Sequence, residues 1–102
     1  MKYFDYKEKK QHGTFDFPID FYYVTPNHPR YNMPYHWHTE WEIIRILEGE
    51  FVLTINDEKF LAHKGDIIFI HDGMFHGGNP NNCIYECIVF NINILLKQNH
   101  AC

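Results

Sequence analysis

The 102-residue chain lacks several features that would assign it to a class at once. No stretch approaches the roughly 20 consecutive apolar residues that a membrane-spanning helix needs. The segment after Met1 is charged, whereas a secretory signal is apolar at this point. We therefore expect a protein that stays out of membranes and lies in the cytoplasm.

Positive charge is also scarce. Lys and Arg together number 9 against 13 Asp and Glu, so the formal net charge is -4 with neutral histidines, and the basic residues are scattered along the chain. Segments that bind nucleic acid concentrate positive charge on one face or one stretch. We expect no direct nucleic-acid contact by this segment, and any DNA binding would belong to another domain.

Cysteine is too rare for a disulfide framework. The three thiols are an odd number without the spacing of a zinc ribbon, and in a cytoplasmic protein they are expected to be reduced. A second interpretation, in which Cys83 and Cys87 form a thiolate pair, stays open.

Helical periodicity is nearly missing, and this favours an all-β fold. Short apolar runs separated by Gly, Pro, Asn and Asp recur about every ten residues, as in antiparallel sandwiches and barrels. A chain of this length forms one domain and buries roughly two-thirds of its unfolded surface. We expect an arm at residues 1–14, the domain at 15–96, and the start of a linker or of a truncated further part at 97–102.

Individual strands can be placed inside this domain. We predict one at 15–25, a break at the proline-rich stretch 26–34, and a longer apolar stretch at 42–57 with a turn at Glu48-Gly49. The polar residues 56–59 predict a hairpin turn. The last apolar run, 83–96, is a strand whose end alternatively begins a helix.

The chain is rich in histidine, with eight residues, and two of them flank Trp37 in the stretch HWHTEWE. His36 and His38 lie on the same side of an extended strand, about 7 Å apart. Glu42 reaches them only if the chain turns at Thr39-Glu40-Trp41, so we predict that turn. His76, in a glycine-rich stretch, is a fourth candidate.

Three imidazoles and one carboxylate form a mixed nitrogen and oxygen donor set. Such a set suits Zn, Fe, Mn, Ni or Cu better than Ca or Mg, and it leaves coordination positions open. The alternative is a pocket in which the four side chains make hydrogen bonds without a metal. His71 is expected at a turn or on the surface, with a role as fifth ligand as its alternative.

The spacing of these residues resembles the two motifs of the cupin family. Residues 36–49 read H-x-H-x3-E-x6-G and residues 65–76 read G-x5-H-x-G-x2-H, with 15 residues between Gly49 and Gly65. The resemblance implies a small single-domain cupin, a double-stranded β-helix or jelly-roll barrel. The chain departs from the family pattern at three positions, namely Arg30, His71 and Pro80.

A closer resemblance covers residues 28–78 and 85–95. These stretches, which begin with HPRYNMPYHWHTEWE and YECIVFNINIL, are similar to the amino-terminal sensing domain of AraC-family transcription regulators. That family implies a non-catalytic cupin that binds a small-molecule effector, often a sugar, and supports a homodimer. DNA would be bound by a separate carboxy-terminal helix-turn-helix domain, which residues 1–102 do not resemble.

The resemblance leaves an alternative function. A free-standing metal-dependent cupin enzyme, such as a dioxygenase or isomerase, would use His36, His38, Glu42 and His76 as catalytic residues. In the sensor, the same four would line the effector pocket. Because small-molecule sites are largely apolar, aromatic residues are expected beside them, and our candidates are Tyr23, Trp37 and Phe51.

Overall fold

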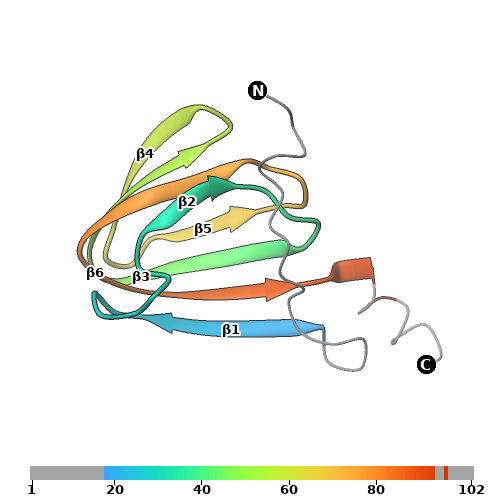
Figure 1. The fold of residues 1–102 in the computed structure, drawn as a ribbon, viewed down its shortest axis with the longest axis horizontal. Coiled ribbons are helices and arrows are strands. Elements are labelled where there is room, and N and C mark those ends of the chain that lie inside the picture. The colour runs from blue at the N-terminus through green and yellow to red at the C-terminus, as the bar shows by residue number, and fades with distance from the viewer. Residues whose placement is uncertain (1–17, 94–95, 97–102) are drawn as a thin grey trace.

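The fold is an antiparallel β structure with strands in two layers (Figure 1). The computed structural model describes residues 18–93 and Leu96. The predicted arm at 1–14 and the predicted segment at 97–102 lie outside these residues. The six strands are β1 (Ile19–Val24), β2 (Met33–His36), β3 (Trp41–Ile55), β4 (Glu58–His63), β5 (Ile67–Ile70) and β6 (His76–Phe90).

The two longest strands, β3 and β6, pair with each other over nearly their whole length and belong to both layers. One layer has the order β1–β6–β3–β5, and it uses the last part of β6 and the first part of β3. The other has the order β2–β6–β3–β4, and it uses the remaining parts. The prediction of an all-β single domain is confirmed.

Both long strands bend where they pass from one layer to the other. The register between them shifts on either side of Glu48, and Gly49 has a φ of 76°. A Cβ atom on Gly49 would collide with the backbone carbonyl of Asn82. The predicted turn at Glu48-Gly49 is therefore wrong as a strand end, because β3 continues through it as an irregular stretch that stays paired with β6.

The predicted hairpin turn and the predicted change after the last strand are confirmed, whereas the bounds of the predicted break are wrong. The hairpin between β3 and β4 turns at Asn56 and Asp57, whose φ angles of 46° and 70° fit a tight hairpin turn. The chain leaves the last strand at Asn91, and Ile92 and the next residue are helical. The predicted break at 26–34 is too long, because β2 already begins at Met33.

Side chains from both layers form a buried core between them. Strand alternation buries Glu42, Ile44 and Ile46 on β3 and leaves Arg45 exposed. The buried apolar cluster consists of Val24, Ile44, Ile46, Phe51, Leu53, Ala62, Ile70, Cys83, Tyr85 and Cys87. Since these residues come from both layers, they form one core.

Two tyrosines fix the irregular link between β1 and β2 to this core. The hydroxyl of buried Tyr85 lies 2.9 Å from the carbonyl oxygens of both Arg30 and Tyr31, and it can donate to either. The Tyr31 hydroxyl in turn accepts the backbone N–H of Cys83 at 3.2 Å. The link therefore has a defined position despite its prolines, and it sets where β2 begins. Among the described residues, no helix is long and apolar enough to span a membrane.

Candidate metal centre

Three chain segments bring the four candidate ligands together. His36 is the last residue of β2, His38 lies in the link that follows it, and His76 is the first residue of β6. The chain bends at residues 39 and 40, and β3 then carries Glu42 back between the layers. The turn predicted before Glu42 is confirmed.

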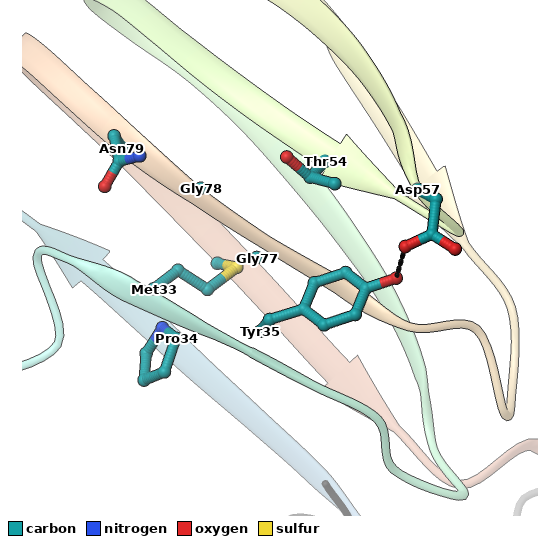
Figure 2. Close-up of a pocket in the computed structure, with 8 residues that line it drawn as sticks. All are labelled: Met33, Pro34, Tyr35, Thr54, Asp57, Gly77, Gly78 and Asn79. Carbon is teal, nitrogen blue, oxygen red and sulfur yellow. Dashed lines mark hydrogen bonds between the residues drawn. The ribbon is translucent and has the colours of Figure 1, made fainter. Parts of the chain in front are cut away.

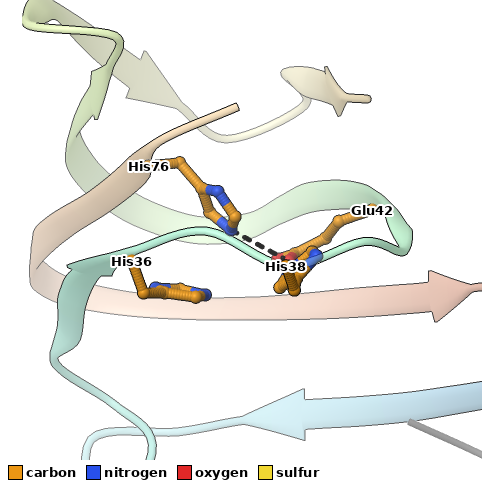
Figure 3. A group of neighbouring side chains, drawn as sticks. All are labelled: His36, His38, Glu42 and His76. Carbon is orange, nitrogen blue, oxygen red and sulfur yellow. Dashed lines mark hydrogen bonds and ion pairs between the residues drawn. The ribbon is translucent and has the colours of Figure 1, made fainter. Parts of the chain in front are cut away.

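The four side chains point to one place between the two layers (Figure 3). One potential ligand atom from each lies within 4.8 Å of the others. The ring centroids of His36 and His76 are 4.2 Å apart, and those of His38 and His76 are 4.9 Å apart. His38, Glu42 and His76 are buried, whereas His36 is partly exposed, so the group is accessible from the side of His36.

Each imidazole is oriented by a backbone carbonyl. Nδ1 lies 2.6 Å from the Pro34 oxygen in His36, 2.9 Å from the Glu40 oxygen in His38, and 3.0 Å from the Met74 oxygen in His76. A carbonyl oxygen can only accept, so in each ring Nδ1 donates its proton. A neutral imidazole held in this way turns the lone pair of Nε2 toward the centre, as in metal-bound histidines.

The carboxylate faces two of these nitrogens. Glu42 Oε1 lies 3.0 Å from Nε2 of His38 and 3.2 Å from Nε2 of His76. Burial would raise the pKa of Glu42, but the hydrogen bonds and the charges of the two histidines hold it below its usual range. Because an Nε2 lone pair and a carboxylate repel, this arrangement needs either imidazolium protons or a cation between them.

The donor set fits a divalent transition metal. Ligand atoms bound at about 2.1 Å to one tetrahedral ion lie about 3.4 Å apart. The separations here are all within 4.8 Å, so the widest of them must shorten by at most about 1.4 Å to reach that geometry. Three neutral nitrogens and one carboxylate suit zinc or iron better than calcium or magnesium.

A bulge in β2 sets the position of His36. Met33 pairs with Gly78 and His36 with His76, so Pro34 and Tyr35 lie opposite the single residue Gly77. A Cβ atom on Gly77 would lie 2.8 Å from both Cα and N of Tyr35. This bulge was not predicted from the sequence, although a proline inside a strand and a glycine pair after His76 are typical signs of one.

The bulge is held from its outer side by Tyr35. The Tyr35 ring stacks on Phe75 with centroids 5.4 Å apart, and its hydroxyl donates to Oδ1 of Asp57 at 3.3 Å. Tyr35 and Asp57 also border a surface pocket of about 410 Å³ between β2 and the β3–β4 hairpin (Figure 2). The lining of this pocket includes none of the four candidate ligands.

The three predicted aromatic pocket residues lie in different places. Phe51 is buried in the core and packs edge-on against Tyr85 at 4.8 Å, and Trp37 is buried in the link between His36 and His38. Tyr23 is 53% exposed and lies on the face of β1 opposite to Val24. The expectation that Tyr23 lines the effector pocket is corrected, because strand alternation turns its side chain outward.

The positions of His71 and of the two cysteines decide two alternatives that the sequence left open. His71 is exposed and tilts against Trp41 at 5.7 Å, outside the group of four, so it is not a fifth ligand. Cys83 and Cys87 are buried free thiols on one strand, four residues apart, and neither belongs to that group. Burial raises the pKa of the Cys83 thiol to about 11, which keeps it protonated.

Comparison with solved structures defines the class of the fold. An RmlC-like cupin from Shewanella frigidimarina matches with a TM-score of 0.63, at 16% identity over 72% of this chain and 66% of that one. At this identity the likeness concerns the fold alone, and the fold is that of the cupins. The jelly-roll prediction is confirmed.

The sequence defines the family within this class. The AraC-like ligand binding domain family matches residues 18–91, and the chain belongs to it. The uncharacterized HTH-type transcriptional regulator YdeC of Bacillus subtilis is 33% identical over 90% of the chain. The HTH-type transcriptional activator RhaS of Pectobacterium carotovorum is 32% identical over 52%. These matches span only 33% and 19% of the two regulators.

Proposed function

We propose that this chain is the effector-sensing domain of a cytoplasmic, homodimeric AraC-type transcription regulator. It would bind a small molecule between its layers and would catalyse no reaction. The DNA-binding helix-turn-helix units would lie in another part of the regulator. Family membership and the names of the two regulators support this proposal.

We further propose that His36, His38, Glu42 and His76 hold one divalent transition-metal ion, which could be zinc, iron, manganese, nickel or copper. The observation that carries this is the common orientation of the three rings, with every Nδ1 on a carbonyl and the Nε2 atoms directed inward. When bound, such an ion supplies a Lewis-acidic charge that can hold an oxygen atom of a ligand.

The protein's own residues would then determine how an effector is bound. His36 is the partly exposed member of the four, so an effector would approach on its side, while buried His38 and His76 fix the carboxylate of Glu42. An effector with hydroxyl or carboxylate oxygens, for example a sugar, matches this polar end. The apolar core beyond it gives hydroxyl groups no partners.

The metal proposal is tested by metal content and by affinity. Purified protein should bind about one equivalent of Zn²⁺ or Co²⁺, and His76→Ala should lose it because a structural ligand is removed. His63→Ala is the matched control, since the His63 side chain is 59% exposed and lies outside the group of four. Equal metal binding by His76→Ala and wild type would exclude this centre.

The sensor proposal is tested in two steps. The reading frame should continue past residue 102 into a basic helical segment, as a regulator requires. A panel of sugars and sugar acids should then include a compound that raises the melting temperature of the domain and changes the DNA affinity of the full-length protein. Turnover of a panel compound, with no effect on DNA binding, would instead support the metal-dependent enzyme.

A further inference from the structure

The outer face of the layer β1–β6–β3–β5 is unusually apolar. The pairing of the strands shows which side chains lie next to one another on it. Its middle row runs across all four strands as Phe21, Ile88, Ile43 and Phe69. Antiparallel sheets that face water carry polar side chains on that side. Here the whole row is apolar, so this face resembles the interior of a protein.

The next row contains two charged residues, whereas the middle row contains none. It runs as Tyr23, Glu86, Arg45 and Ile67, and Arg45 forms an ion pair with Glu86 at the centre of the face. The four outermost side chains of the two rows are largely open to solvent, with exposed fractions of 58% for Phe21, 53% for Tyr23, 66% for Ile67 and 54% for Phe69. An apolar patch of this kind on a soluble domain marks an interaction surface.

We propose that this face is covered by the same face of a second copy of the chain, related by a twofold axis that runs along the strands between β6 and β3. Such an axis exchanges β1 with β5 and β6 with β3. Because the residues are aligned in rows, it places Phe21 on the partner's Phe69 and Ile88 on the partner's Ile43. The same operation brings Arg45 to the partner's Glu86.

Charge complementarity is what selects a second copy over another partner. The face has one positive and one negative side chain side by side, so it has no net charge to attract an oppositely charged surface. A twofold axis between them turns the internal ion pair into two ion pairs across the interface. An isologous contact requires this kind of self-complementary patch.

The size of the face fits a weak dimer. Four strands at about 4.8 Å spacing and six residues at about 3.3 Å give a footprint of about 400 Å². A standard interface buries about 800 Å² of accessible surface on each partner. The accessible area of protruding side chains exceeds their footprint, so the contact lies at the lower end, with an expected dissociation constant in the micromolar range.

The test uses the full 102-residue chain and mixes two charge variants. Arg45→Glu and Glu86→Arg each break the internal ion pair and place like charges opposite each other in the homodimer, which should weaken self-association by about 30-fold or more. Mixed in equal amounts, the two should form a heterodimer close to wild-type strength. Only contacts between chains can produce this recovery, because neither variant has an internal pair.

Sedimentation equilibrium measures the association, and a second exposed ion pair provides the matched control. Lys64 and Glu48 interact at 3.1 Å outside these rows, and the reversals Lys64→Glu and Glu48→Lys should leave the dimer unchanged. A wild-type chain that is monomeric throughout the micromolar range, or homodimers that persist without recovery on mixing, would refute the proposal. The proposal does not depend on the metal centre, since His76→Ala should dimerise as the metal-free wild type does.

Discussion

Replacing Gly77 by alanine tests how the β2 bulge positions His36. The added methyl group would lie 2.8 Å from Cα and N of Tyr35 and 3.0 Å from the carbonyl oxygen of Met33. All three atoms belong to the backbone of β2, so no side-chain rotation relieves the contact. Overpacking of this kind costs about 1–3 kcal/mol of unfolding free energy, and here it moves β2 away from β6.

The displacement of β2 should lower metal affinity by more than a substitution elsewhere that destabilises the fold to the same extent. His36 is the last residue of β2, and its Nδ1 partner is the carbonyl of Pro34 within the bulge. Loss of such orienting contacts lowers metal affinity by about 10- to 100-fold. We therefore expect Gly77→Ala to weaken Zn²⁺ binding in titration calorimetry by at least about tenfold.

A second glycine separates this effect from general destabilisation. Gly65 has a φ of 92° and open space around its Cα, so Gly65→Ala strains the backbone without a collision. This should cost about 1–2 kcal/mol in urea unfolding with EDTA present, with metal affinity unchanged. If Gly77→Ala binds Zn²⁺ like the wild type, or if both variants lose affinity equally, the bulge does not position His36.

Two further outcomes can be measured on the same protein. Tyr85→Phe should lower the unfolding free energy by about 1–3 kcal/mol in urea, because the carbonyls of Arg30 and Tyr31 lose their buried donor; an unchanged midpoint would count against this clamp. In a Cys102→Ser background, Cys83 should react slowly with a thiol reagent at pH 8. Folding raises the pKa of this thiol from 9.0 to about 11, so fast labelling of the folded chain at pH 8 would contradict the prediction. The contribution of the thiol to stability is present below pH 9 and is lost as the pH rises toward 11.

Local patterns in the sequence were sufficient for much of the fold. Alternation along the sequence is enough to place Glu42, Ile44 and Ile46 on one face of β3, and the structure shows that this face is buried. The turn at Asn56 and Asp57 was also predictable, because these residue types tolerate the positive φ angles that a tight hairpin needs. Both features depend on residues that are close in the chain.

The errors occurred where distant segments decide the conformation. Gly49 predicted a turn, but pairing with β6 keeps β3 extended through it, and the collision partner is the backbone of Asn82. Tyr23 was predicted to line the effector pocket, but its side chain points outward. A shift of one residue along a strand is enough to turn a side chain to the other face. For the same reason the apolar outer face was not foreseen, since its rows exist only once the register of four strands is known.

The candidate centre and the proposed interface lie on opposite sides of the same strand. Glu42 points inward to the histidines, while its neighbours Trp41 and Ile43 point outward, and Ile43 lies in the middle row of the outer face. A change in the position of Glu42 therefore reaches the interface through a single peptide unit. If metal or effector binding shifts β3, it changes the dimer affinity, and dimerisation must change ligand affinity by the same factor. Measuring the dissociation constant of the dimer with and without bound Zn²⁺ gives the size of this coupling directly.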